Sequence, residues 1–224
     1  MGIIYSTRPL QARRKFDHYP TPSGLVRASL ALPQVRPNPI KVLDPGAGTG
    51  VWGSLVREKW PNSFITGIEL QPCVPNDTYD VWNTGDFFRW SANHACQKYD
   101  LIVGNPPYGG ICKDMAEMFV RTCIAHLGPG GQIVFLLRSA FFESISRGRD
   151  LFKNHQPTDM YQCMRRPSFT GNNKTDSTAY SLFLWQKGQN PEYTRAWHLD
   201  WEYGESIEED KPFKPFLLLE DSHA

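Results

Sequence analysis

The stretch Asp44-Pro45-Gly46-Ala47-Gly48-Thr49-Gly50 decides the fold. It follows a short apolar run, Ile40 to Leu43, which predicts a buried strand, and it precedes an amphipathic segment from about Val51 to Trp60, which predicts a helix. Glycines let the backbone approach a bound molecule, and the first turn of a helix offers free N–H groups. A strand, a glycine-rich turn and a helix in this order are typical of open α/β sheets, which bind ligands at the carboxyl ends of their strands.

Strands and helices alternate along the rest of the chain. Residues 64–68, 80–82, 99–103 and 132–137 predict further strands. Residues 23–32, 113–126 and 143–153 predict helices, and the run Gly128-Pro129-Gly130-Gly131 is a strong stop signal after the second of them. The last two strands, 160–164 and 178–185, follow each other without a helix, which predicts an antiparallel hairpin at one edge. The fold class predicted is α/β, with a doubly wound, mostly parallel sheet of seven strands.

Length and composition predict one globular domain with two short appendages. The 224 residues are 40% hydrophobic and 21% charged, and a chain of this length can bury a full core. Residues 1–191 hold 21 Lys and Arg against 14 Asp and Glu, whereas residues 192–224 hold 3 against 9. We therefore expect a basic arm at 1–15, the domain at 16–190 and an acidic tail at 191–224. The basic body is compatible with a nucleic-acid partner, but ordinary solvated charges explain it equally well.

Membrane and metal partners are not expected. No apolar run approaches the ~18 residues of a membrane span, and Met1 to Lys15 lacks the apolar core of a signal peptide, so we expect a cytoplasmic protein. The five cysteines are an odd number without a Cys-x-x-Cys pair, and no two of the six histidines have metal-ligand spacing. Reduced thiols and no metal site are the prediction.

The glycine-rich turn is compatible with two classes of ligand. The run from Gly48 to Gly53 also fits the Gly-x-Gly-x-x-Gly fingerprint of dinucleotide-binding folds. A dinucleotide brings an anionic pyrophosphate, which the carboxylate of Asp44 would repel, whereas a sulfonium methyl donor brings a positive sulfur and an ammonium group. Asp44 therefore favours S-adenosylmethionine, with Gly46, Ala47 and Gly48 as the part of the loop that borders it.

Two further acidic residues follow strands in the order that such a cofactor needs. Glu69 closes the second predicted strand, where an acid can accept hydrogen bonds from both hydroxyls of a ribose. Asp86 follows the third predicted strand. We expect its carboxylate to accept a hydrogen bond from the amino group of the cofactor's adenine, with Phe87 against the adenine ring. Either acid alone would be a weak signal, but their order and spacing after Asp44 strengthen the prediction.

The tetrapeptide Asn105-Pro106-Pro107-Tyr108 directly follows the fourth predicted strand. Its two prolines have no backbone N–H, so their backbone can only accept hydrogen bonds, through the carbonyl oxygens. The side-chain oxygen of Asn105 and the carbonyl of Pro106 can accept both hydrogens of one amino group, and Tyr108 offers a flat face for stacking. Holding both N–H bonds in the geometry of the developing tetrahedral nitrogen stabilises the transition state more than the planar ground state. Asn105 is expected to border the cofactor as well.

These motifs resemble the adenine-N6 DNA methyltransferases of restriction–modification systems and phages, over about residues 16–186. Asp44 to Gly50 looks like the cofactor loop of that family, and Asn105 to Tyr108 matches its catalytic tetrapeptide. Tyr19-Pro20-Thr21-Pro22 is similar to the segment that covers the methionine end of the cofactor, which implies this role for Tyr19, Thr21 and Pro22. Arg166-Pro167-Ser168-Phe169-Thr170 is similar to the late motif whose aromatic residue stacks on the flipped base, which implies Phe169 for that role. The fold implied is the Rossmann-like methyltransferase type, and the reaction implied is methylation of adenine N6 in DNA.

The chain departs from the family after residue 186. Members with this motif order usually carry a sizeable recognition domain at the C-terminus, and only 38 residues follow here. Several alternatives therefore stay open. The substrate could be adenine N6 or guanine N2 in RNA, or a glutamine side chain in a protein. The chain could also act with a separate specificity subunit, or bind nucleic acid without catalysis. The candidate phosphate contacts are Arg147, Arg149, Lys153, Arg165, Arg166 and Lys174.

Overall fold

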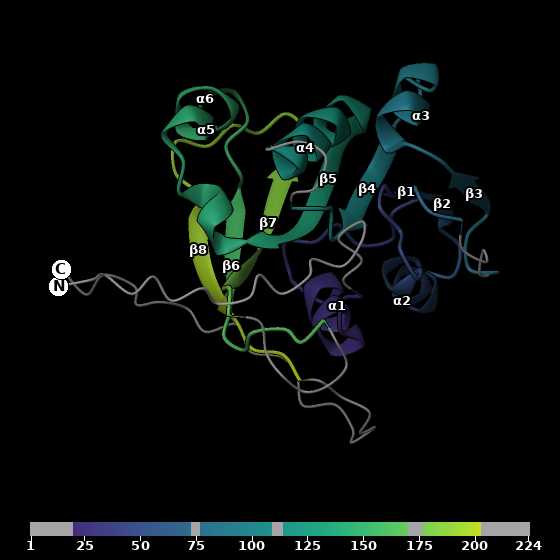
Figure 1. Ribbon diagram of the computed structural model, residues 1–224, viewed down its shortest axis with the longest axis horizontal. Helices are drawn as coiled ribbons and strands as arrows, with labels where there is room; N and C mark the ends of the chain where they lie inside the picture. The colour runs from purple at the N-terminus through teal and green to yellow at the C-terminus, as the bar shows by residue number, and fades with distance from the viewer. Residues whose placement is uncertain (1–19, 73–76, 109–113, 170–176, 203–224) are drawn as a thin grey trace, which may run out of the picture.

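One sheet with helices on both faces forms the body of the protein (Figure 1). The computed structural model describes residues 20–72, 77–108, 114–169 and 177–202. The strands are β1 (Lys41–Asp44), β2 (Phe64–Glu69), β3 (Val81–Thr84), β4 (Tyr99–Gly104), β5 (Leu127–Arg138), β6 (Asp159–Cys163), β7 (Tyr180–Gln186) and β8 (Arg195–Leu199). The helices are α1 (Ser23–Leu30), α2 (Val51–Lys59), α3 (Phe87–Asn93), α4 (Met115–His126), the 3-10 helix η2 (Ser139–Phe142), α5 (Ile145–Arg149) and α6 (Leu151–Asn154).

The strand order of the sheet is β3-β2-β1-β4-β5-β7-β6-β8. Neighbours from β3 to β5 are parallel, β7 is antiparallel to both β5 and β6, and β8 is parallel to β6. The order reverses between β1 and β4, because β2 lies on one side of β1 and β4 on the other. This topology confirms the doubly wound, mostly parallel α/β fold with an antiparallel pair of late strands.

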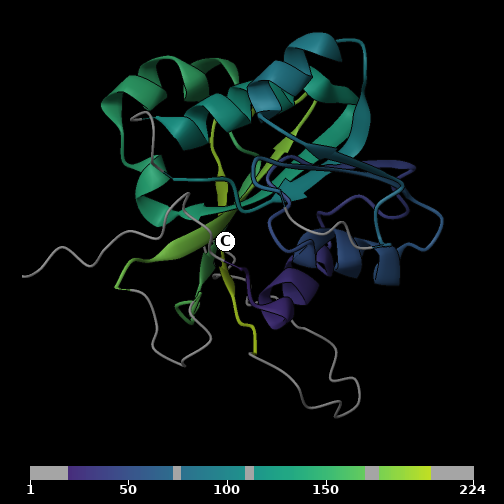
Figure 2. The same cartoon turned by 45° about the vertical axis from the view of Figure 1, so that its right-hand side comes forward.

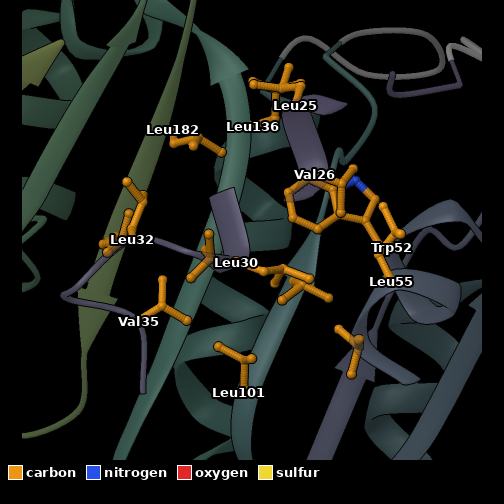
Figure 3. Packing of buried hydrophobic residues seen from close by; sticks show 14 of the residues in the cluster. Leu25, Val26, Leu30, Leu32, Val35, Trp52, Leu55, Leu101, Leu136 and Leu182 are labelled. Atoms are coloured by element: carbon orange, nitrogen blue, oxygen red, sulfur yellow. The ribbon is translucent and has the colours of Figure 1, made fainter. Parts of the chain in front are cut away.

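Apolar side chains of the strands point alternately to two cores, one on each face of the sheet. α1 and α2 cover one face, and α3, α4, α5 and α6 cover the other (Figure 2). On the first face, Leu25 and Leu30 of α1 and Trp52 of α2 lie against Leu101 and Leu136 of the sheet (Figure 3). Because the central strands are covered on both faces, their apolar runs are continuous, as parallel sheets require. None of the described helices is both long and apolar enough to span a bilayer.

The sheet has eight strands rather than the predicted seven, because part of the expected acidic tail joins it. β8 lies at the edge beyond the β6–β7 pair, so that pair is not the edge itself. The carboxylate of Asp159, only 1% exposed, holds β8 in place by binding Nε of Arg195 at 2.8 Å and accepting a hydrogen bond from Nε1 of Trp197 at 3.0 Å. Trp201, just beyond β8, is also buried.

Two other elements differ from the prediction in extent. β5 begins at Leu127, five residues earlier than expected, and the glycine-rich run lies inside it as an irregularity opposite Tyr99 to Leu101. A Cβ on Gly131 would lie 2.6 Å from the carbonyl oxygen of Tyr99, so glycine permits this close approach. The single helix predicted for residues 143–153 is divided into α5 and α6, because Asp150 between them has a non-helical backbone.

Candidate functional site

The candidate site lies at the carboxyl ends of β1 and β4, where the strand order reverses. β1 ends at Asp44 and β4 at Gly104, and the two strands are hydrogen-bonded neighbours. Gly104 has a φ of +156°, and a Cβ added there would lie 3.4 Å from Oδ1 of Asp44. Glycine at this position therefore allows the loop after β1 and the tetrapeptide after β4 to lie side by side, in the crevice where such sheets bind ligands.

Asp44 is fully buried, and its two carboxylate oxygens have different surroundings. Oδ2 accepts a hydrogen bond from the hydroxyl of Tyr79 at 2.7 Å, while Oδ1 has no hydrogen-bond partner among the described residues. Burial raises the pKa of Asp44 to about 7, and the carboxylate of Glu69 adds to this effect, whereas the Tyr79 hydroxyl and the N–H groups of Gly53 and Gly46 oppose it. A buried carboxylate oxygen without a donor fits a cationic ligand and disfavours a pyrophosphate.

Tyr79 is a site residue that the sequence-based prediction missed. Its ring packs over two glycines: a Cβ on Gly53 would lie 2.3 Å from its Cζ, and a Cβ on Gly67 would lie 2.6 Å from its Cδ1. Gly53 belongs to α2 and Gly67 to β2, so both elements leave room for the tyrosine. The available signal was Gly67 itself, since a glycine inside a strand often marks a close approach of another group.

Glu69 anchors the glycine-rich loop to the end of β2. Its Oε2 accepts a hydrogen bond from the N–H of Gly48 at 2.8 Å, and its Oε1 accepts one from the N–H of Gln71 at 3.0 Å. The N–H of Ala47 donates to the carbonyl of Ile68 at 2.9 Å. The structure thus brings Gly46, Ala47 and Gly48 next to Glu69, and the ribose-binding role of Glu69 stays a prediction.

Asp86 and Phe87 follow β3 at the same edge of the sheet. The N–H of Gly85 donates to the carbonyl of Glu69 at 2.8 Å, which fixes this turn beside the end of β2. Oδ1 of Asp86 caps α3 by accepting the N–H of Arg89 at 2.8 Å. Phe87 is buried, with its ring centroid 4.9 Å from that of Phe119. Their contacts with a cofactor adenine stay predictions.

The expected N-terminal segment is described from Pro20 onward, so Tyr19 lies outside the described residues. Thr21 is buried, and its Oγ1 accepts a hydrogen bond from Nε1 of Trp52 in the first turn of α2 at 3.3 Å. Pro22 precedes α1, and its carbonyl accepts the N–H of Val26 at 3.2 Å. Thr21 thus lies close to the helix that follows the glycine-rich loop. Trp52 itself belongs to the hydrophobic core on this face of the sheet.

The tetrapeptide is held by its own tyrosine. The hydroxyl of Tyr108 donates to Oδ1 of Asn105 and also lies 3.1 Å from the carbonyl oxygen of Leu136 in β5. Pro106 is buried, and Asn105, Pro107 and Tyr108 are partly exposed. A carbonyl oxygen has two lone pairs, so Oδ1 of Asn105 can accept a second hydrogen bond from a substrate amino group while it keeps that of Tyr108.

An aromatic cluster surrounds Tyr108. Its ring centroid lies 5.6 Å from that of Tyr180, and Tyr180 lies 5.0 Å from Phe169. Tyr108 and Phe169 thus share Tyr180, a residue of β7 that the prediction missed. Phe169 is only 4% exposed, and its stacking on a substrate base stays a prediction. Arg138 is a second residue of this cluster that the prediction missed. Its guanidinium carbon lies 5.2 Å from the ring centroid of Tyr108.

Two of the candidate phosphate contacts lie near carboxylates, and their phosphate-binding role stays a prediction. Arg147 lies 3.9 Å from both Asp114 and Glu117, and Arg165 lies 3.6 Å from Asp200. The remaining candidates are Arg149, Lys153 and Arg166, which are exposed, and Lys174, which lies outside the described residues. In the described ranges, no group of three or more His, Cys, Asp or Glu side chains could hold a metal ion.

Comparisons with known proteins relate the chain to methyltransferases. A family model described as a methyltransferase domain matches residues 14–191. The type II methyltransferase M.CvrRI of Paramecium bursaria Chlorella virus XZ-6E is 35% identical over 155 residues, which are 60% of this chain and 40% of that protein. A tRNA1(Val) (adenine(37)-N6)-methyltransferase of Glaesserella parasuis is 32% identical over 97 residues, which are 38% of each protein.

A solved structure shares the fold. The M protein of the type I restriction enzyme EcoKI superimposes with a TM-score of 0.60 at 17% identity, over 82% of this chain and 48% of that one. The superposition confirms the expected type of α/β fold. The chain spans less than half the length of all three proteins.

Proposed function

The chain belongs to the methyltransferase domain family, and we propose that it transfers the methyl group of S-adenosylmethionine to the N6 amino group of adenine in DNA. The observation that carries the proposal is the position of Asn105-Pro106-Pro107-Tyr108, directly beside the buried carboxylate of Asp44. One side of this crevice suits a cationic methyl donor, and the other presents carbonyl oxygens to an amino group. A planar amine held between them is in position for in-line transfer.

The proposed cofactor residues lie at the carboxyl ends of β1, β2 and β3. Asp44, Glu69 and Asp86 would hold S-adenosylmethionine, together with the backbone of Gly46 and Gly48. When bound, the cofactor supplies a methyl group activated by a sulfonium. The unpartnered Oδ1 of Asp44 fits the positive charge of this donor, and the carboxylate of Glu69 keeps the loop in place through the N–H of Gly48.

The tetrapeptide acts on the acceptor nitrogen. An aryl amine is a poor nucleophile, because its lone pair is delocalised into the ring. Oδ1 of Asn105 and the carbonyl of Pro106 would accept the two N–H bonds, and these hydrogen bonds strengthen as the nitrogen becomes tetrahedral. The Tyr108 hydroxyl holds Asn105 in place, and its ring would stack on the base, a contact worth about 1–3 kcal/mol. No strong base is required, since the proton can leave after methylation.

The choice of DNA is supported by the similarity to a type II methyltransferase and by the fold shared with a restriction-enzyme M protein. A duplex substrate requires the target base to be flipped out, at a cost of about a few kcal/mol. The similarity to a tRNA adenine-N6 methyltransferase favours the same chemistry on RNA as the second candidate. A separate specificity subunit and a cytoplasmic location belong to the same proposal.

Transfer of labelled methyl groups from S-adenosylmethionine tests the proposal. The acceptors are unmethylated duplex DNA, single-stranded DNA, ribosomal RNA and tRNA, with product nucleosides identified by mass spectrometry. N6-methyladenine in DNA that disappears in Asn105→Ala supports the proposal, and N6-methyladenine in RNA alone supports the second candidate. N2-methylguanine, or no methylated nucleoside at all despite cofactor binding, refutes the adenine assignment for the isolated chain and directs the search to other acceptors or a partner subunit.

A further inference from the structure

Arg138 is the last residue of β5 and lies beside the tetrapeptide. It pairs with Tyr180 of β7, and its guanidinium carbon lies 5.2 Å from the ring centroid of Tyr108. The carboxyl end of β5 is thus where a positive charge meets the residues assigned to the acceptor base. Figure 1 shows β5 in the middle of the sheet, with β4 on one side and β7 on the other.

The side chain of Arg138, unlike its backbone, has an unsatisfied hydrogen-bond donor within the described part of the chain. Its Nε is buried and has no hydrogen-bond partner there, and no carboxylate of a described residue lies within 4.0 Å of its guanidinium. Arg147 is different, since its Nε donates to the carbonyl of Phe141 at 2.8 Å and its guanidinium faces two acids. The side chain as a whole is only partly buried, and a guanidinium without a carboxylate beside it can offer its outer N–H groups to an oxyanion.

The sheet order separates Arg138 from the cofactor residues. Asp44 and Glu69 close β1 and β2, while Arg138 closes β5, and β4 with its tetrapeptide lies between them. An anion at Arg138 therefore lies on the acceptor side of the tetrapeptide. On that side, a nucleic-acid substrate brings phosphates next to the target nucleotide, and the planar fork of a guanidinium matches their geometry.

We propose that Arg138 binds a backbone phosphate adjacent to the target nucleotide. The proposal rests on the proposed function only in that the substrate is a nucleic acid. By fixing the backbone beside Tyr108, this contact would position the target base over the tetrapeptide. Arg138 is thus a substrate-binding residue that is distinct from the exposed basic residues of α5 and α6.

The test compares Arg138→Gln with the wild-type protein in binding an unmethylated DNA duplex of mixed sequence over a series of salt concentrations. Losing one phosphate contact should make the slope of log K against log salt shallower by about 0.9. The Kd for the duplex should rise about tenfold at moderate salt, and the Kd for S-adenosylmethionine should stay unchanged. Arg36→Gln is the matched control, because Arg36 lies near Asp100 at the amino end of β4, away from the carboxyl ends that carry the site, and its slope and Kd should stay at wild-type values.

The outcomes separate this proposal from the proposed function. An unchanged slope and Kd in Arg138→Gln overturn the phosphate contact even if the wild-type protein methylates DNA. A weaker affinity for S-adenosylmethionine with an unchanged DNA slope overturns it in favour of a contact to the cofactor carboxylate. A reduced slope without any methylated adenine supports the contact and refutes the adenine-N6 function. If Arg138→Gln reduces the salt slope for tRNA binding but not for DNA binding, the phosphate that Arg138 contacts belongs to an RNA substrate.

A second variant covers the case in which Arg138→Gln does not fold. Arg138→Lys keeps the charge and loses the fork, so we expect the salt slope to be kept and the Kd for the duplex to rise about threefold to tenfold. Thermal unfolding of both variants shows which one is folded. A folded Arg138→Lys with the wild-type Kd overturns the proposal.

Discussion

Replacement of Tyr79 by phenylalanine isolates one hydrogen bond. The ring that fills the space over Gly53 and Gly67 remains, and only the hydroxyl that donates to Oδ2 of Asp44 at 2.7 Å is removed. Asp44 is fully buried, so no solvent water replaces the lost donor at that oxygen. Since the pKa of Asp44 is about 7 with this bond in place, and the bond lowers it, the pKa in Tyr79→Phe must be higher.

The size of the effect follows from the energy of the bond. A hydrogen bond to a charged group contributes about 1.5–3 kcal/mol, and about 1.4 kcal/mol corresponds to one pKa unit. The pKa of Asp44 should therefore rise by about 1–2 units in Tyr79→Phe. A cationic cofactor binds the ionised form, so its Kd increases about tenfold for each pH unit below the pKa of Asp44. Near neutral pH the variant should bind S-adenosylmethionine about tenfold more weakly, and at alkaline pH the two proteins should converge.

Calorimetric titration with S-adenosylmethionine over a pH series measures this midpoint directly. Tyr161→Phe is the matched control, because its hydroxyl binds Gln34 and is remote from Asp44. Asp44→Asn should have a flat profile in the same range. A midpoint in Tyr79→Phe equal to that of the wild-type protein would refute the role of Tyr79. Retention of the wild-type midpoint in Asp44→Asn would show that another group titrates.

Three further predictions concern the same crevice. Asn105→Ala should lower kcat by about 10²–10³ while binding of S-adenosylmethionine is largely kept, as single-turnover kinetics and titration can show. The pKa of Asp44 is about 7 in the folded protein and near 3.8 when unfolded, so the folded state holds this proton more tightly. In the cofactor-free protein, the contribution of Asp44 to stability should therefore fall as pH rises from about 4 to 7, by on the order of 4 kcal/mol at most. Urea unfolding should show this as a pH-dependent difference between the wild-type protein and Asp44→Asn. Gly53→Ala places a Cβ 2.3 Å from the Tyr79 ring and should lower the free energy of unfolding by about 1–3 kcal/mol. The same variant should shift the pH midpoint of cofactor binding upward. Wild-type stability together with a wild-type midpoint would contradict the packing described.

The parts of the molecule that were predictable are those in which local sequence carries the signal. The strand, turn and helix around Asp44 and the proline pair after β4 are fixed by neighbouring residues, and the structure confirms the fold that they imply. Their order along the chain also places them at the same edge of a parallel sheet. The fold and the location of the site follow from this.

The parts that were missed depend on residues far apart in the sequence. Tyr79 belongs to no motif, and its role arises only where Gly53, Gly67 and Asp44 meet. Arg138 ends an apolar strand, where a charged residue is ordinarily a solvated terminus. β8 has a weak strand pattern, and its pairing depends on Asp159, which precedes it by more than thirty residues.

The pairing of β8 has a consequence for any attempt to define a minimal folded fragment. A truncation at residue 190, where the composition changes, would remove Arg195 and Trp197, the two partners of the carboxylate of Asp159, and would leave β6 as an edge strand that is unpaired on one side. Loss of the partner of a buried charge costs about 3–5 kcal/mol, a large part of the stability of an ordinary domain. Such a fragment should be poorly soluble when expressed, and a fragment that also carries Asp159→Asn should recover part of its yield. The shortest well-behaved form of this protein should therefore extend at least through Trp201.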